Sequence, residues 1–327
     1  SMSQRDPWER IVSVHTTGIY ESNYLKANSP DGARGLWIKH NLLRQTDGSG
    51  MGEFWVIRFE RGQPPVVAKN EVEWQSLRLK DNAIGIECDT IALSPRHAAG
   101  RIADIQWDIQ LGTSLPPLLH FPSDWMYTAS FPKKKAVTPA PNLRFDGVLS
   151  VGNDRWEIRD WVGLRGHNWG REHAHTYAYG NCNIWEDGQE RTIDGFSARI
   201  KLPGGVLSPW LSTVVGRTPD HDLNRIQHWF GGTEVSGDSW QLTKGPCALR
   251  MTCDPSTYVG LRYLHPDGTE SYCYNTKFAD VRWETPQGAH SSSMGELEIL
   301  TPQPLPEIPL HPPTDWSQDD GPYRSHP

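Results

Sequence analysis

The sequence predicts an all-β protein, and three observations support this. Glycine and proline are abundant and dispersed, with 30 and 26 residues respectively, which is typical of a chain with many turns. Short strand-like runs recur about every ten residues, and few runs have the helical period. The chain has 327 residues, more than one hydrophobic core usually supports. Because strand-like runs occur on both sides of the middle, we expect two similar β units.

The first half of the chain is typical of a meander or barrel. Leu36–Leu43 and Glu53–Phe59 flank a Gly-rich turn and are expected to pair as a hairpin. Residues Pro116–Pro141 contain six prolines and interrupt the pattern, so we expect a long excursion over a barrel mouth. Further strands are predicted at Pro65–Lys69, Ser76–Lys80, Ala83–Cys88, Ile91–Ser94, Ile102–Leu111, Phe145–Val151 and Arg155–Val162.

The second half repeats this rhythm and ends in a tail. The tail, Thr301–Pro327, holds eight prolines, so we expect a surface strap or disorder. We therefore expect one barrel over residues 1–180, a second over 181–300 and a Pro-rich tail over 301–327. Strands are predicted at Gly195–Leu202, Trp210–Val215, Ile226–Phe230, Ser239–Leu242, Ala248–Cys253, Thr257–Leu264, Glu270–Phe278 and Glu296–Leu300.

Charge and composition exclude several classes of protein. The 32 basic and 39 acidic groups leave a net charge of −7, and the longest basic run is Lys133–Lys135, so no nucleic-acid partner is expected. We find no apolar run long enough to span a membrane and no signal peptide. Five cysteines without CxxC spacing favour a reducing compartment, and we expect a cytoplasmic protein.

The stretch Asp160–Trp185, at the middle of the chain, has the highest density of polar, titratable and aromatic side chains. From His173 it alternates with a period of two, which predicts a strand with one small and one bulky face. The bulky rings carry groups that need partners when buried, which favours a ligand-lined cavity. An exposed strand is the alternative, because antiparallel sheets often leave one face in water. The bulky face contains His173, His175, Tyr177, Tyr179, Asn181, Asn183 and Trp185.

Three kinds of chemistry compete for this stretch. His173 and His175 share a side of the strand and, with His167 or Glu172, would form a metal site, but the spacing matches no zinc signature. Nucleophilic catalysis is disfavoured, because GxSxG is absent and Cys182 lies on the small face.

The third kind is general acid–base work among aromatic rings. A carboxyl of Asp160, Glu172 or Asp194 that is desolvated by such rings would have a raised pKa and act as an acid. Protonation of an alkene gives a carbocation, which aromatic faces stabilise. The structural alternative is a polar network that braces a domain junction, with His167 and Asp160 bonded to backbone groups.

The segment Gly166-His167-Asn168-Trp169-Gly170, with Asp160-Trp161 before it and an aromatic strand and the turn EDGQ after it, resembles a family motif. It is similar to the H-x-W-G centre of the lipocalin-like family, which contains carotenoid 1,2-hydratases (hydroxyneurosporene hydratases), AttH-type proteins and related cyclases, including fungal Diels–Alderases. Tyr263–Ala279 resembles a hairpin in the second barrel of these proteins. The resemblance implies two lipocalin-like (calycin) antiparallel barrels with a ligand pocket in or between them.

The resemblance also implies roles for individual residues. In the hydratases, the His and Trp of the motif and a later acidic residue protonate an isoprenoid double bond and add water. His167 and Trp169 match by position, and Asp194 is the nearest acid, with Asp187 and Glu190 as alternatives. The chain is shorter than typical hydratases and has the extra pair His173 and His175, which departs from the family pattern.

We therefore expect a lyase of the hydratase type or a cyclase that acts on an isoprenoid or polyketide-derived substrate by acid catalysis. Catalysis is assigned to His167, Trp169, Glu172 and Asp194. Substrate binding is assigned to Asp160, Trp161, Asn168, His173, His175, Tyr177, Tyr179 and Trp185.

Two alternatives stay open at this stage. One is a lipid or small-molecule binder without chemistry. The other is a pericyclic cyclase, in which Asn168 or Tyr177 activates a carbonyl and no acid is needed. We expect a hydrophobic small-molecule partner with peripheral access from a membrane surface, and no metal or other cofactor; the sequence does not predict the oligomeric state.

Overall fold

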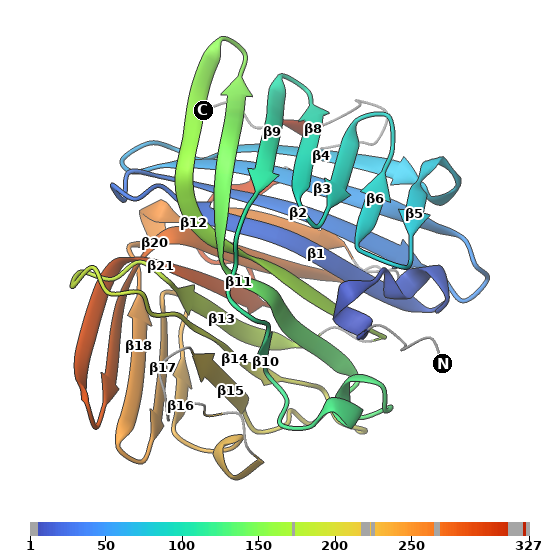
Figure 1. Cartoon of the computed structure of the whole chain (residues 1–327). Coiled ribbons are helices and arrows are strands. Elements are labelled where there is room, and N and C mark those ends of the chain that lie inside the picture. Colours follow the sequence, from blue (N-terminus) through green and yellow to red (C-terminus); the bar gives the residue numbers. More distant parts are fainter. Residues whose placement is uncertain are drawn as a thin grey trace.

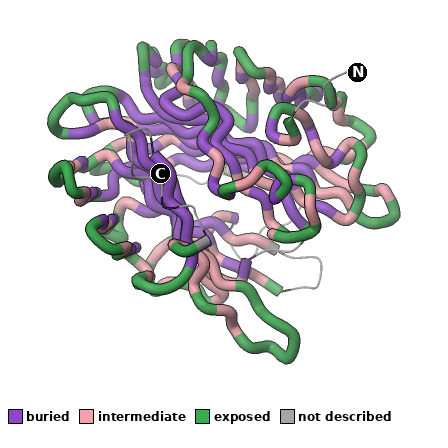
Figure 2. Tube along the Cα trace, turned by 60° about the horizontal axis from the view of Figure 1, so that its bottom comes forward, coloured by how far each residue is buried: buried purple, intermediate pink, exposed green. Residues whose placement is uncertain are grey.

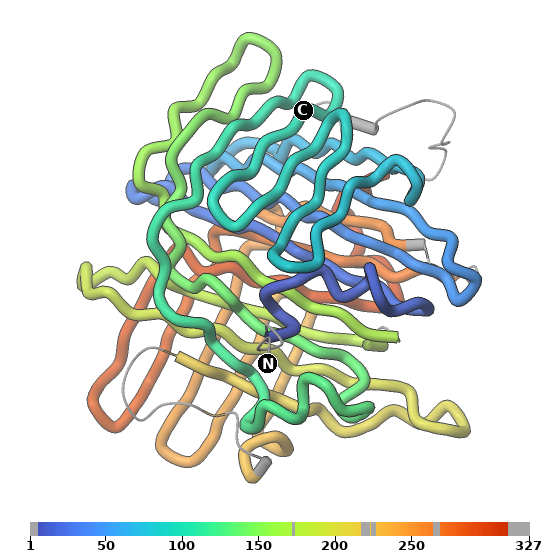
Figure 3. The backbone as a smooth tube through the Cα atoms, turned by 45° about the vertical axis from the view of Figure 1, so that its right-hand side comes forward, coloured from blue at the N-terminus to red at the C-terminus, as the bar shows by residue number. Residues whose placement is uncertain are grey.

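The structure is a computed structural model that describes residues 6–171, 174–216, 223, 226–264, 269–312 and 323–324. Within these residues the regular elements are β-strands and short 3-10 helices, so the all-β prediction is confirmed. The strands form two antiparallel sheets, one shaped as a half-barrel and the other as a nearly closed barrel. Figures 1 and 3 show the first sheet, coloured blue to green, above the second, coloured yellow-green to red.

The first sheet has thirteen strands in the described residues, and its order is β23-β4-β3-β2-β1-β12-β11-β9-β8-β7-β6-β5, with β10 paired to β11. Its strands are β1 (Ile19–Asn28), β2 (Arg34–Arg44), β3 (Gly50–Glu60), β4 (Val66–Glu73), β5 (Arg78–Lys80), β6 (Gly85–Glu87), β7 (Ile91–Ser94), β8 (His97–Ile102), β9 (Ile105–Leu111), β10 (Leu118–Leu119), β11 (Lys134–Val151), β12 (Asp154–Gly170) and β23 (Tyr323–Arg324).

The second sheet has ten strands in the described residues, and its order is β15-β14-β13-β21-β20-β18-β17-β16, with β19 between β20 and β22. Its strands are β13 (Thr176–Cys182), β14 (Ile193–Arg199), β15 (Leu211–Gly216), β16 (Thr233–Val235), β17 (Ser239–Lys244), β18 (Cys247–Thr252), β19 (Val259–Leu264), β20 (Glu270–Thr285), β21 (Gly288–Thr301) and β22 (Leu310–His311). The 3-10 helices are η1 (Pro7–Glu9), η2 (Val12–Val14), η3 (Trp74–Ser76), η4 (Asp124–Tyr127), η5 (Ile226–His228) and η6 (Pro255–Thr257).

The hairpin predicted from the alternating runs around the Gly-rich turn is present. β2 and β3 pair in register from Arg34 with Glu60 to Arg44 with Gly50. The excursion predicted over Pro116–Pro141 ends earlier than expected, because β11 begins at Lys134. Pro139 and Pro141 therefore lie inside a strand. They are tolerated because the pairing of β11 with β12 shifts register beside each of them, where an N–H donor is not needed.

The two sheets divide between β12 and β13. β12 ends at Gly170, and β13, which begins at Thr176, pairs with β14 and β21 of the second sheet. The expected barrel boundary at residue 180 falls within β13. The tail contacts both sheets, because β22 pairs with β19 and β23 pairs with β4.

Four clusters of buried side chains are present in the described residues, and three of them organise the two sheets. Figure 2 shows the buried positions running along the strands while exposed positions lie in loops. One cluster, with Leu25, Ile38 and Phe145, fills the first unit. A second, with Trp240 and Met251, fills the second unit. A third lies between the sheets and joins side chains of β2, β3 and β4 to those of β19, β20 and β21. This third cluster fixes the two sheets against each other and so positions the site described below. In the described residues no helix is long and apolar enough to span a membrane.

Candidate functional site

The alternation of strand side chains places two different surfaces on the first sheet. In β2, Ile38 and Leu42 point into the core of the first unit, whereas Lys39 and Asn41 point toward the second unit. β1 alternates in the same way, with Leu25 in the core and Ser22 on the opposite face. The sequence of these strands therefore builds a polar surface that faces the second barrel.

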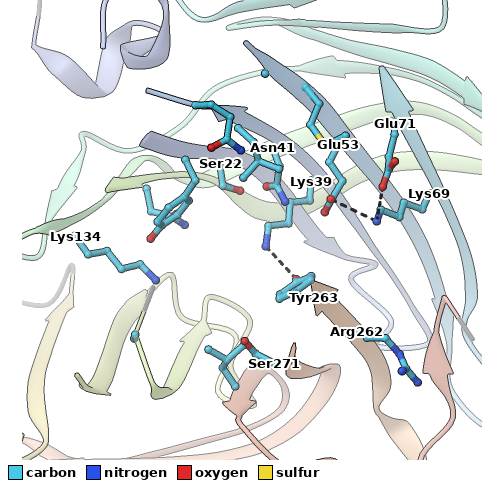
Figure 4. A pocket seen from close by; sticks show the side chains of 18 of the residues that line it. Ser22, Lys39, Asn41, Glu53, Lys69, Glu71, Lys134, Arg262, Tyr263 and Ser271 are labelled. Carbon is cyan, nitrogen blue, oxygen red and sulfur yellow. Dashed lines mark hydrogen bonds and ion pairs between the residues drawn. The ribbon is translucent and has the colours of Figure 1, made fainter. Parts of the chain in front are cut away.

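An interdomain pocket of about 490 Å³ lies on this surface, within the size range of small-molecule sites. Strands β1 to β4, β11 and β12 form one wall, and β13 and β19 to β21 form the other (Figure 4). The lining combines apolar residues with amines, hydroxyls and amides. It consists of Tyr20, Ser22, Lys39, Asn41, Leu43, Gln45, Ser49, Gly50, Met51, Glu53, Lys69, Glu71, Lys134, Asn168, Ala174, Tyr177, Arg262, Tyr263, Ser271, Leu300 and Pro312.

The lysines of the interdomain pocket differ in their partners: Lys69 is paired with carboxylates, whereas Lys39 is not. Lys69 contacts two carboxylates, at 3.4 Å from Glu53 and 3.1 Å from Glu71, so this end contains an ion-paired group. At the other end Lys39 donates to the hydroxyl of Tyr263 over 3.0 Å, and its ammonium lies 4.8 Å from the centre of that ring. Figure 4 shows Lys39 and Lys134 pointing into the same space.

Lys134 is the least compensated charge of the interdomain pocket. Among the described residues its ammonium has no hydrogen-bond or ion-pair partner, and it lies 4.9 Å from the ring centre of Tyr177 and 5.9 Å from that of Tyr20. Burial, together with the nearby charge of Lys39, lowers the pKa of Lys134 to about 8. An amine of this kind exchanges protons near neutral pH and attracts an anionic or polarised oxygen.

Two of the residues predicted for substrate binding line the interdomain pocket. Asn168 points into it from β12 and Tyr177 from β13. The hydroxyl of Tyr177 lies 3.9 Å from the Cys273 sulfur, which donates to the Glu298 carboxylate over 3.0 Å. Burial raises the pKa of Tyr177 well above its ordinary value, so its hydroxyl stays protonated and serves as a donor.

The predicted catalytic pair His167 and Trp169 points to the opposite face of β12 from Asn168. His167 is fully buried, with Nε2 2.7 Å from the Glu21 carboxylate and Nδ1 3.2 Å from the Trp8 carbonyl. Glu21 also accepts bonds from the backbone of Val12 and from Ser13. Trp169 packs beside His167 in a buried cluster. This arrangement ties the N-terminal 3-10 helices to β1 and β12 within the first unit. It differs from the network at a domain junction that sequence analysis gave as the structural alternative, because it lies within one unit and does not include Asp160.

Asp194 lies in a second buried network. Its Oδ2 accepts from the hydroxyls of Thr138 at 2.7 Å and Tyr179 at 3.1 Å, and its Oδ1 is 3.2 Å from Nε2 of His120. Nδ1 of His120 is 3.4 Å from the hydroxyl of Thr213. Asp194 and Tyr179 are therefore in contact, but neither lines the interdomain pocket.

The structure does not bring the other predicted residues to the interdomain pocket. Asp160 is exposed near Arg144, and Trp161 packs in the core of the first unit. Trp185 packs in the core of the second unit and donates to the Arg191 carbonyl.

The remaining predicted residues belong to the segment that joins the two sheets. His175 is half-buried just before β13, and burial lowers its pKa. Glu172 and His173 lie outside the described residues. In the part of the chain that is described, no group of three His, Cys, Asp or Glu side chains is placed to hold a metal ion.

Sequence reasoning missed Lys39, Lys134 and Tyr263. Tyr177 was identified because polar and aromatic residues occupy one face of its strand. The same pattern occurs in β1, where Tyr20, Ser22 and Tyr24 share a face. Applying it to β1 and β2 would have found Lys39 and four other lining residues, Tyr20, Ser22, Asn41 and Leu43, but not Lys134 or Tyr263.

The fold defined by these two sheets is that of the lipocalin-like hydratases and cyclases, as the sequence motif predicted. The structure is similar, at a TM-score of 0.51 in each case, to an AttH-type protein from Nitrosomonas europaea, to kievitone hydratase from Nectria haematococca and to CghA with Sch210972. These likenesses cover 86%, 91% and 86% of this chain and 92%, 94% and 88% of the other. Sequence identity is 12%, 10% and 10%, so they establish the fold.

The sequence itself has a curated relative without an assigned function. An uncharacterised protein of Mycobacterium tuberculosis, Rv0493c, is 23% identical over 296 residues, which span 85% of this chain and 84% of that protein. No family profile matches the chain.

Proposed function

We propose that this protein is a hydratase- or cyclase-type enzyme whose substrate is a largely apolar molecule with a carbonyl group conjugated to the reacting alkene. The substrate occupies the interdomain pocket, with its carbonyl toward Lys39, Lys134 and Tyr263. Its apolar part lies against Leu43, Leu300 and the neighbouring apolar residues. Polyketide-derived compounds and oxidised isoprenoids have this chemistry, whereas isoprenoid hydrocarbons do not.

The observation that carries the proposal is the placement of two amines, Lys39 and Lys134, in one pocket without a carboxylate bonded to either in the described residues. An uncompensated ammonium in a partly desolvated pocket favours a ligand that supplies negative charge. A carbonyl oxygen that gains negative charge during addition to its conjugated alkene is such a group.

The geometry suggests how the reaction would be accelerated. When water or a diene adds to an alkene conjugated with a carbonyl, electron density moves onto the carbonyl oxygen. Fixed donors aimed at that oxygen stabilise the transition state more than the ground state, and losing one costs about 10²- to 10³-fold in comparable sites. Lys39 and Tyr263 form a preorganised donor pair, because they are already bonded to each other.

Acid catalysis at an unconjugated alkene has less support. The carboxylates that line the interdomain pocket, Glu53 and Glu71, both contact the ammonium of Lys69, at the end of the pocket away from Lys39 and Lys134. Asp194 is buried with its partners outside the pocket lining. The proposal therefore shares with the pericyclic alternative, in which Asn168 or Tyr177 activates a carbonyl, the activation of a carbonyl by a polar group, and it assigns that role to Lys39 and Tyr263.

A panel of candidate substrates tests this proposal. Conjugated polyenones and size-matched isoprenoid hydrocarbons are incubated with the protein, and products are resolved by chromatography with mass detection. Hydration adds the mass of one water, cyclisation changes retention without changing mass, and a binder that performs no chemistry changes neither. We expect turnover of a polyenone, reduced about 100-fold in Tyr263→Phe or Lys39→Met.

The control for the panel is Lys80→Met, which removes an exposed lysine of β5 outside the pocket and should leave turnover unchanged. Conversion of hydrocarbons alone, or full activity in both pocket variants, would contradict the proposal.

A further inference from the structure

Lys134 stands apart from the other charged groups of the interdomain pocket. Lys69 is bound to two glutamates and Lys39 to a tyrosine, whereas the described residues offer Lys134 only aromatic faces. Its position near the start of β11, opposite Gly170 of β12, leaves its side chain reaching into the pocket. A primary amine that is held in a ligand-sized cavity without a bonded partner is free to react with what the cavity binds.

The surroundings of Lys134 also favour its uncharged form. The rings of Tyr177 and Tyr20 lie close to its ammonium. Burial and the charge of Lys39 lower the pKa of Lys134, whereas Glu298 and Cys273 raise it by less. With a pKa of about 8, about one Lys134 amine in ten is uncharged at pH 7, against fewer than about one in a thousand for an ordinary lysine. Desolvation and a neighbouring cationic group both activate a lysine as a nucleophile in this way.

We propose that the amine of Lys134 condenses with an aldehyde or ketone group of the substrate and holds it as an imine. This inference rests on the proposed function, because it takes the same pocket and specifies how the carbonyl is held. The nitrogen lone pair attacks the carbonyl carbon and a C–N bond forms. The carbonyl C–O bond then breaks, and the oxygen leaves as water with the two protons of the amine.

The imine would activate the conjugated alkene for the proposed addition or cyclisation. Protonation gives an iminium ion, which withdraws electrons from a conjugated alkene more strongly than a carbonyl does. Lys39 and Tyr263 donate to the carbonyl oxygen during the attack and to the departing water. Hydrolysis by one water restores the amine and releases the product carbonyl, so no oxidant or reductant is consumed.

Reductive trapping tests the imine directly. The full-length protein is incubated at pH 7 with benzaldehyde and sodium cyanoborohydride, and benzylated lysines are located by peptide mass analysis. We expect Lys134 to be modified at least tenfold faster than the exposed Lys80 in the same sample, with a rate that rises as the pH approaches 8. Labelling of Lys134 no faster than Lys80 would overturn the inference.

Two variants separate the imine from a purely structural or electrostatic role of Lys134. Lys39→Gln removes the repelling charge, so the pKa of Lys134 rises and its labelling at pH 7 falls by roughly threefold or more. Lys134→Arg keeps the positive charge but cannot form an imine. With a substrate from the panel, lost turnover in Lys134→Arg supports the inference. Full turnover in this variant overturns it while the proposed function stands, and circular dichroism verifies that each variant is folded.

Discussion

At the scale of single residues, the segment His167-Asn168-Trp169 shows how strand alternation separates neighbours. Asn168 lines the interdomain pocket, whereas His167 and Trp169 are buried on the other side of β12. Sequence analysis placed all three residues in the predicted site. The side on which each residue lies depends on which face of β12 meets the second sheet. That information comes from contacts between strands far apart in the chain, such as the 146 residues between Glu21 and His167.

The buried hydrogen bond between Glu21 and His167 predicts a defect in stability when it is removed. Burial opposes ionisation of Glu21, but the bonds from His167, Val12 and Ser13 outweigh it and hold the pKa of Glu21 below its ordinary value. Glu21→Gln removes a buried carboxylate that is bonded to His167, Val12 and Ser13, and it should cost about 1–3 kcal/mol in free energy of unfolding, measured by urea denaturation. Glu87→Gln removes an exposed partner of Arg78 and should cost less than about 1 kcal/mol.

The same pair predicts a dependence on pH. Because the folded state lowers the pKa of Glu21, its contribution to stability is present above the ordinary glutamate pKa of 4.5 and is lost as the pH falls through the pKa of the folded state. Stability of the wild type should therefore fall more steeply than that of Glu21→Gln as the pH drops below 4.5. Equal stability of the two proteins at pH 7 would show that the pair does not brace the N-terminal segment.

At the scale of elements, the strands that could be predicted are those with simple alternation. β2 and β3 alternate apolar and polar residues around a Gly-rich turn, and their pairing was predicted. β1 was missed because both of its faces are buried and one is polar, with Ser22, Tyr24 and Lys26 in place of an apolar stripe. Its burial depends on the second sheet covering it, which local sequence does not show.

Gly166 of the GHNWG segment illustrates a constraint between elements. A methyl group at Gly166 would overlap the ring of Tyr24, which packs edge-on against Tyr179 of β13 at 6.3 Å between ring centres. Gly166→Ala should therefore displace Tyr24 and destabilise the protein by about 1–3 kcal/mol, measured by chemical denaturation.

Gly112→Ala is the matched control for Gly166→Ala, because an added methyl group there would meet its nearest neighbour, Arg144, at 3.5 Å. We expect a change within about 0.5 kcal/mol. If the two variants lost similar free energies of unfolding, the contact between Gly166 and the ring of Tyr24 would not be needed for stability.

At the scale of the whole molecule, buried charges join the two sheets. Lys26 of β1 forms an ion pair with Glu296 of β21, and Lys277 of β20 lies 2.9 Å from the same carboxylate. Burial alone would lower the pKa of Lys26, but Glu296 and Glu298 outweigh it and raise that pKa. The pairing of these charges fixes how the sheets meet, and with it the shape of the interdomain pocket.

The sequence predicted the class of fold and the importance of the chain's middle, but not this interface. Alternation and turn residues are local signals, and they identified many of the strands and the family motif. The interdomain pocket takes residues from ten strands, so the partnership of Lys39, Lys134 and Tyr177 depends on the packing of two separate sheets.

The measurement that tests the pocket assignment most directly is a crystal structure of the protein with dodecanoate, a simple apolar acid. We predict that its carboxylate contacts the amine of Lys39 or Lys134 and that its chain lies toward Leu43 and Leu300. Dodecanoate bound inside either barrel, beside His167 or Asp194, with the interdomain pocket empty, would contradict the account.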